Sequence, residues 1–236
     1  MSKEEAVVSA TQVEPPVGLV LGNGPSLDLL SREEWERLYG LHHVGVNRAF
    51  LSEAVVKNFT FRRLLLLDHP RDVEHWGQTP NYFQAYARFK GVRILADRTA
   101  GRRRPQSLPP DTYFKPMKHW VSKDMLPELR RNSEEYMFFK GGRSPASAAN
   151  LLALENCRTI LFIGVDRLPG RCKLVENYEG VSLKRQPETL DEKKSDEFFW
   201  EDTVAEAKAA GVSLLSIAPK SNLKALPRVP LGSLKW

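Results

Sequence analysis

The feature that most constrains the fold is a short apolar segment followed at once by two glycines, in residues 17–27, VGLVLGNGPSL. An apolar run this short, bounded by glycine, is typical of a buried parallel strand and not of a helix. Gly22 and Gly24 allow a sharp turn with backbone N–H groups close to a ligand, and Pro25 and Ser26 suit the first turn of a helix. This arrangement predicts an anion site, most often for phosphate; a tight turn without a ligand is the alternative interpretation.

Strand and helix patterns alternate along the rest of the chain. Apolar segments predict further strands at residues 43–46, 64–67, 92–95, 113–116, 159–163 and 212–217. Helical patterns lie at residues 29–38, 49–57, 81–90, 144–155 and 195–210. The alternation predicts an α/β, Rossmann-like three-layer fold with a mainly parallel sheet. We expect a flexible leader (1–16), a single nucleotide-binding domain (17–228) with an irregular lid at about 167–194, and a tail (229–236).

Local signals mark the ends of several elements. Ser31 precedes Glu33 and Glu34, which predicts a helix N-cap, and Ser144 or Ser147 would cap the helix that runs to about residue 155. The alanines of the helix predicted at residues 144–155 permit close packing on a sheet.

Polar residues follow three of the predicted strands. Asn47 follows residues 43–46, Asp68 follows the run of four leucines at 64–67, and Asp166 follows the strand at 159–163. Ligands in parallel α/β sheets collect beyond the carboxyl ends of the strands. We therefore expect these side chains, the turn and the Gly/Ser loop at residues 141–144 to converge on one cleft.

Charge and composition narrow the class of partner. The 236 residues carry a formal net charge of +6, which favours anionic ligands in a general way. Arg102, Arg103 and Arg104 could contact a polyanion, but no zinc spacing or recognition motif indicates specific nucleic-acid binding. Two cysteines predict no disulfide framework, and we expect a cytoplasmic protein without a secretory signal or a transmembrane segment.

Four motifs carry a resemblance to a known family. They are GNGPSL, VNRAF, a glycine–serine loop before an Ala-rich helix, and I-x-x-I-G-V-D, and SLLSIAPKSNLKALP follows near the end. Over roughly residues 17–228 the chain resembles the bacterial family 42 sialyltransferases. It equally resembles related domains that include archaeal hydroxymethylpterin pyrophosphokinase and many uncharacterised phage and bacterial proteins.

The resemblance implies a nucleotide-binding site. In the sialyltransferases the glycine turn and the strand-end Asn hold the nucleotide, and lid tyrosines help the phosphate to leave. Tyr178 is the lid tyrosine that matches by position. The nucleotide-binding residues implied here are Gly22, Asn23, Gly24, Pro25, Ser26, Asn47 and Arg48, with Gly142, Arg143 and Ser144 at the ribose or phosphate.

One departure concerns the catalytic base. The sialyltransferases use a lid-region His to deprotonate the acceptor, and this chain has no His after His119. A base near neutral pH is most readily His or a carboxylate with a raised pKa. His75 and His119 also lie beside tryptophans and could simply pack there. The candidates are Asp68, His69, His75, His119 and Asp166.

The sequence leaves three functions open, of which the first is narrowly favoured over the second and the third ranks last. The first is a glycosyltransferase that uses a nucleotide sugar, possibly CMP-linked, and a glycan or other hydroxyl acceptor, with no metal required. The second is a diphosphokinase acting on a pterin-like alcohol, in which Asp68 and Asp166 would hold Mg²⁺. The third is a non-catalytic relative that binds nucleotide, or nucleic acid through residues 102–104. The oligomeric state has no signal in the sequence.

Overall fold

A parallel sheet forms the centre of the computed structural model, which describes residues 16–47, 49, 144–167 and 190–236, together with strand segments at 11–12, 63–66, 92–97 and 112–116. In chain order the sheet of these residues contains β2 (Val17–Leu21), β3 (His42–Val46), β4 (Arg63–Leu66), β5 (Val92–Asp97), β6 (Thr112–Pro116), β7 (Thr159–Ile163) and β8 (Ser213–Ser216). The spatial order is β6-β5-β4-β3-β2-β7-β8, and every neighbouring pair is parallel. The predicted α/β fold with a parallel sheet is confirmed.

Both faces of the central strands are buried, which makes the fold three-layered. One face belongs to a core cluster that contains Val20, Val44 and Phe162. The neighbouring Leu19 and Leu161 are also fully buried, and they lie on the other face because successive strand residues point in opposite directions. Double burial explains why these strands are continuous apolar runs in the sequence.

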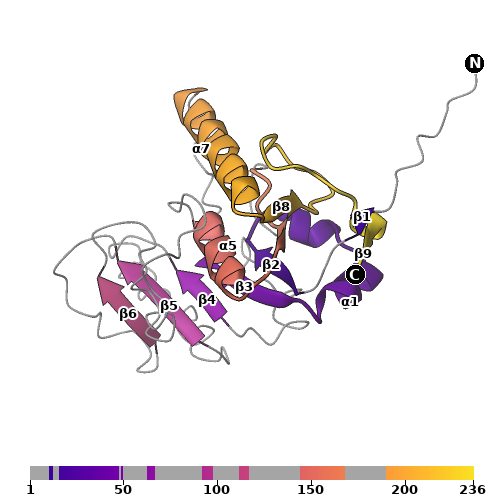
Figure 1. The fold of residues 1–236 in the computed structure, drawn as a ribbon, viewed down its shortest axis with the longest axis horizontal. Coiled ribbons are helices and arrows are strands. Elements are labelled where there is room, and N and C mark those ends of the chain that lie inside the picture. Colours follow the sequence, from indigo (N-terminus) through magenta and orange to yellow (C-terminus); the bar gives the residue numbers. More distant parts are fainter. Residues whose placement is uncertain are drawn as a thin grey trace, which may run out of the picture.

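Helix α5 (Ser144–Leu154) covers one face of the sheet, across β2 and β3 (Figure 1). Gly18 of β2 lets the helix approach closely, because a Cβ added there would lie 3.1 Å from Leu152. Helix α7 (Leu190–Ala209) packs against β8, and its Trp200 meets Phe162 edge to face with ring centroids 5.7 Å apart. These two helices complete the core on that face.

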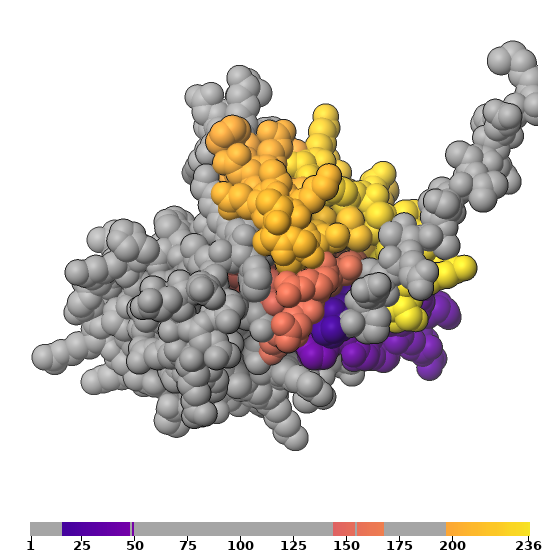
Figure 2. Space-filling model, viewed as in Figure 1, coloured from indigo at the N-terminus to yellow at the C-terminus, as the bar shows by residue number. Residues whose placement is uncertain are grey.

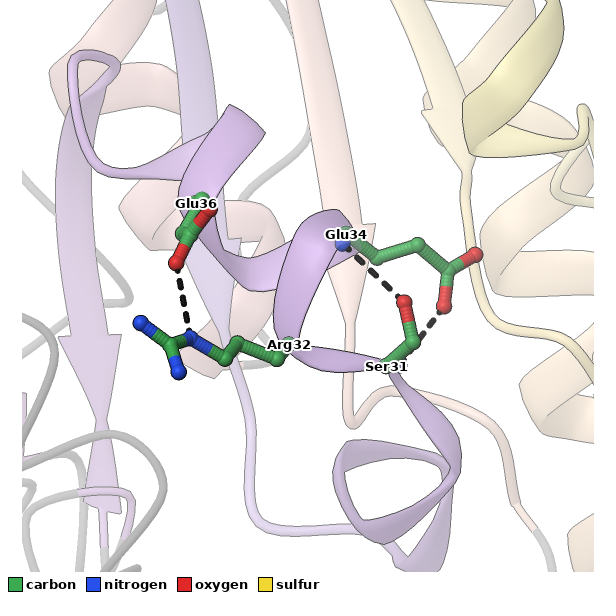
Figure 3. A network of polar contacts seen from close by, with 4 residues as sticks. All are labelled: Ser31, Arg32, Glu34 and Glu36. Atoms are coloured by element: carbon green, nitrogen blue, oxygen red, sulfur yellow. Dashed lines mark hydrogen bonds and ion pairs between the residues drawn. The ribbon is translucent and has the colours of Figure 1, made fainter.

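The short helix α1 (Arg32–Leu38) begins at the predicted Ser31 N-cap (Figure 3). The Ser31 hydroxyl accepts the Glu34 N–H at 3.2 Å, and the Glu34 carboxylate accepts the Ser31 N–H at 2.8 Å. This reciprocal capping box satisfies two N–H groups that a helix start leaves without intrahelical partners. Arg32 and Glu36 form an exposed ion pair one turn apart.

The C-terminal residues are packed against the domain, which corrects the predicted tail and part of the predicted leader. Residues 229–236 contain η4 (Leu231–Ser233) and β9 (Leu234–Lys235), and β9 pairs in parallel with β1 (Thr11–Gln12). The Arg37 guanidinium donates to the carbonyls of Leu231 and Leu234 and lies 5.1 Å from the centre of the Trp236 ring. In Figure 2 the yellow C-terminal part of the chain lies beside the orange helix α7 and against the purple N-terminal elements.

The predicted lid also needs correction at its end. Helix α7 begins at Leu190, so residues 190–194 are helical and not irregular. The strand and helix boundaries elsewhere lie close to their predicted positions. The helices predicted at residues 49–57 and 81–90 lie outside the described residues, apart from Ala49.

Candidate functional site

The order of the strands reverses beside the glycine turn. From β2 the chain proceeds through β3 to β6 on one side of the sheet, and it then returns to add β7 and β8 on the other side. In open parallel sheets this reversal of strand order is where ligands bind, beyond the carboxyl ends of the strands. Here the two strands at the reversal are β2 and β7. The GNGPS turn at residues 22–26 follows β2, and residues 164–167 follow β7.

Four hydrogen bonds join these two loops. The N–H of Gly22 donates to the Ile163 carbonyl, and that of Gly24 to the Gly164 carbonyl, both at 2.8 Å. The Gly164 N–H donates to the Ser26 hydroxyl at 3.0 Å. The Ser26 N–H donates to Asp166 Oδ2 at 2.9 Å. Two segments almost 140 residues apart in the chain are thereby held as one unit.

The close approach explains why the turn contains glycine. A Cβ at Gly22 would overlap the Gly164 carbonyl oxygen and lie 2.6 Å from its carbonyl carbon. A Cβ at Gly24 would lie 2.5 Å from Asp166 Oδ1. Gly164 itself has a φ of 71°, in the left-handed region that favours glycine. The glycines therefore serve contact between loops, which the sequence pattern alone did not distinguish from contact with a ligand.

The amide groups of the turn have partners within the protein. Those of Gly22, Gly24 and Ser26 bond to the β7 end and to Asp166, and the Leu27 N–H donates to the Gly24 carbonyl at 3.2 Å. We had expected such amides to bind phosphate, and these four bond internally. In the turn, Asn23 and Pro25 are partly exposed, whereas Gly22, Gly24 and Ser26 are buried. Their roles in nucleotide binding stay predictions.

Asp166 lies at the centre of this arrangement. It is 1% exposed, and its backbone carbonyl accepts the N–H of Asn222 at 2.7 Å and lies 3.4 Å from the Ser221 hydroxyl. Its carboxylate accepts the Ser26 N–H near the start of η1 (Pro25–Leu29). The predicted carboxylate thus contacts the turn, and its predicted roles as a base or a Mg²⁺ ligand remain untested.

Asn47 lies at the end of the strand next to the turn. Its φ of 50° is in the left-handed region, which Asn tolerates better than most residues, and it is partly exposed. In the register of β2 and β3, Leu21 pairs with Gly45, so Asn23 and Asn47 each follow that pair by two residues. Two amide side chains therefore come from adjacent strand ends.

Helix α5 begins at this edge of the sheet, since it leads into the parallel strand β7. Its first residue, Ser144, is 8% exposed. Ser147, the other predicted cap, has a hydroxyl that is fully buried in the helix and has no hydrogen-bond partner among the described residues. A buried hydroxyl without a partner is uncommon, and the sequence held no signal for it beyond the serine itself.

Several predicted site residues lie outside the part of the chain that the structure describes. They are Arg48, Asp68, His69, His75, Arg102, Arg103, Arg104, His119, Gly142, Arg143 and Tyr178. Within the described part, no three His, Cys, Asp or Glu side chains come together as metal ligands do. The described helices include none with the length and apolar character needed to cross a bilayer.

Comparison with known proteins gives distant structural likenesses. No family model matches the chain, and no curated protein matches it. The sialyltransferase CST-II, in complex with a trisaccharide acceptor and CMP, aligns with a TM-score of 0.46 and 13% identity over 93% of this chain and 88% of that one. CstII from Campylobacter jejuni, in complex with cytidine-5'-monophosphate, aligns with a TM-score of 0.45 and 12% identity, over 94% of this chain and 88% of that one. Likenesses this distant assign no family or activity, and the fold follows from the sheet topology itself.

Proposed function

We propose that this chain is a nucleotide-dependent transferase whose nucleotide binds at the crevice between the ends of β2, β3 and β7. The observation that carries the proposal is the reversal of strand order between β2 and β7, with Asn23 and Asn47 at adjacent strand ends. An Asn side chain offers both a donor and an acceptor, which suits the edge of a nucleobase or the hydroxyls of a ribose. The start of α5 adds a partial positive charge at the same edge, which favours a phosphate group.

Among such transferases we favour glycosyl transfer from a nucleotide sugar, with a CMP-linked donor as the first to test. The motifs that resemble the family 42 sialyltransferases support this choice. The alternative, Mg²⁺-dependent diphosphoryl transfer to a pterin-like alcohol, would use Asp166 as a metal ligand. Asp166 is enclosed and bonded to Ser26, which makes this alternative the weaker of the two.

The first test is a thermal-shift panel of CMP, CDP, UDP, GDP and ATP, each measured with Mg²⁺ and with EDTA. A ligand present at about one hundred times its Kd stabilises the folded state by about 2.7 kcal/mol. For a chain of this length that corresponds to a Tm increase of about 5–10 °C. A CMP shift that is the same in EDTA would support glycosyl transfer, whereas an ATP shift that requires Mg²⁺ would support diphosphoryl transfer.

A matched pair of variants then locates the site. Asn47 and Asn156 both have positive φ, at 50° and 65°, and Asn156 is exposed at the end of α5 remote from the crevice edge. Glycine relieves the same backbone conformation at both positions. We expect Asn47→Gly to weaken nucleotide binding at least tenfold and Asn156→Gly to leave it unchanged. Equal affinity in both variants would place the nucleotide elsewhere.

A further inference from the structure

Asp166 combines three features that a ligand-binding carboxylate at a strand end does not need. Its side chain is almost wholly buried, at 1% exposure for the residue. Its Oδ2 accepts the Ser26 N–H at 2.9 Å, and its Oδ1 would lie 2.5 Å from a Cβ at Gly24. Its main chain is held separately, by the Asn222 N–H. The carboxylate is therefore packed against the turn, and the C-terminal loop fixes its backbone.

The physical chemistry of a buried carboxylate explains what this contact does. An ionised carboxylate is costly to bury unless hydrogen-bond donors replace the water it loses. The Ser26 amide near the start of η1 is such a donor, and it in turn needs an acceptor. Asp166 therefore supplies the acceptor of the Ser26 amide, which is engaged within the protein.

We propose that Asp166 is a positioning residue of the nucleotide site: it fixes the glycine turn through Ser26, so that the turn presents Asn23 at the crevice. This inference rests on the proposed function and deepens it, because it assigns Asp166 neither to a metal nor to proton transfer. The chain of contacts runs from Asn222 through Asp166 to Ser26 and on to Gly164. The C-terminal loop is thereby part of the frame of the site.

The test compares Asp166→Asn, Asp166→Ala and the control Asp28→Asn, in ¹⁵N-labelled full-length protein. Asp28 lies on the same short helix η1 and is exposed, so its substitution removes the same charge from the surface. The first measurement is the hydrogen-exchange rate of the Ser26 amide without ligand. We expect at least tenfold faster exchange in Asp166→Ala, and rates within threefold of the natural protein in Asp166→Asn, whose amide oxygen can still accept, and in the control.

The second measurement is the Kd for CMP, first in EDTA and then with Mg²⁺. We expect Asp166→Asn to bind within about threefold of the natural protein and Asp166→Ala to bind at least tenfold more weakly. Loss of a Mg²⁺-dependent part of the affinity in Asp166→Asn would overturn the proposal, because it would identify a metal ligand. Unchanged Ser26 exchange in a folded Asp166→Ala variant would overturn it as well.

A third variant covers the case in which Asp166→Ala does not fold. Gly24→Ala displaces the carboxylate without deleting it, and we expect faster Ser26 exchange together with weaker CMP binding. Natural Ser26 exchange in that variant would contradict the role of Asp166. If the natural protein binds no nucleotide in the panel, the proposed function fails, while the Ser26 exchange rates still decide whether Asp166 holds the turn.

Discussion

Replacing Gly22 by alanine would bring a methyl group into the backbone of the loop that follows β7. The added Cβ would overlap the Gly164 carbonyl oxygen and lie 2.6 Å from its carbonyl carbon and 2.9 Å from Val165 Cγ2. The two closest atoms belong to the main chain of Gly164, so rotation of the Val165 side chain cannot relieve the clash. The two loops must separate, and the hydrogen bonds of Gly22 and Gly24 to this segment are then lost or lengthened.

The size of the effect follows from these contacts. Overpacking of a well-packed interior costs about 1–3 kcal/mol. Each of the two backbone hydrogen bonds contributes about 1 kcal/mol net. We therefore expect Gly22→Ala to lower the free energy of unfolding by about 3–5 kcal/mol, from a total of about 5–15 kcal/mol for a typical domain. For a chain of this length the Tm would fall by roughly 10 °C.

The assay is urea denaturation monitored by far-UV circular dichroism. A lower transition midpoint with an unchanged m-value shows that the free energy of unfolding has fallen. Gly40→Ala is the matched control, because no atom lies within 4 Å of the added Cβ and Gly40 does not have a positive φ. That substitution should be neutral or stabilising by up to about 1 kcal/mol. A loss of less than about 1 kcal/mol in Gly22→Ala would refute the claim that the two loops are interlocked.

Three further substitutions test other parts of the fold. Ser31→Ala removes the acceptor of the Glu34 N–H and should cost about 1 kcal/mol in chemical denaturation, with the exposed Ser213→Ala as control. Trp200→Ala deletes a buried ring that packs on the β7 phenylalanine and should cost about 3–5 kcal/mol by thermal unfolding. Arg37→Met removes the two hydrogen bonds that Arg37 donates to the carbonyls of Leu231 and Leu234. Carboxypeptidase should therefore release residues 231–236 faster from this variant than from the control Lys220→Met, and equal rates of release would contradict the anchoring role of Arg37.

The strands were predictable because the sheet buries both of their faces. A parallel strand covered on both sides is a continuous apolar run, and residues 17–21 and 159–163 stand out in the sequence for that reason. Local capping chemistry was equally informative at Ser31, where the acceptor and its partner are three residues apart. These features depend on neighbours in the chain, and sequence reasoning found them.

The beginning of α7 was missed because its first turn is polar. Residues 190–194 read LDEKK and show no apolar periodicity that would mark the first turn of a helix. A usable signal was present, since Thr189 is followed three residues later by Glu192, the spacing of a capping box. Propensity and capping would have extended the helix where periodicity could not.

The docked C-terminus was missed for a different reason. Leu231 and Leu234 stand among proline, glycine and lysine, a composition that predicts a loose end. Both are buried, and the cation that holds their carbonyls is Arg37, more than 190 residues earlier in the chain. Such a contact is a property of the assembled fold, so no local pattern could predict it.

Asp166 likewise combines a local signal, which the sequence shows, with a contact that only the assembled fold creates. The sequence places a carboxylate at the end of a strand, and in a parallel sheet that position suggests a ligand or a metal. Its function depends on which loop lies beside it, and that is decided by the order of strands. Because β7 is added next to β2, the carboxylate meets the Ser26 amide, 140 residues away in the sequence. Had β7 been added at the far edge of the sheet, beyond β6, the glycine turn would have lacked this acceptor and would have needed an anion from solution to fill its place.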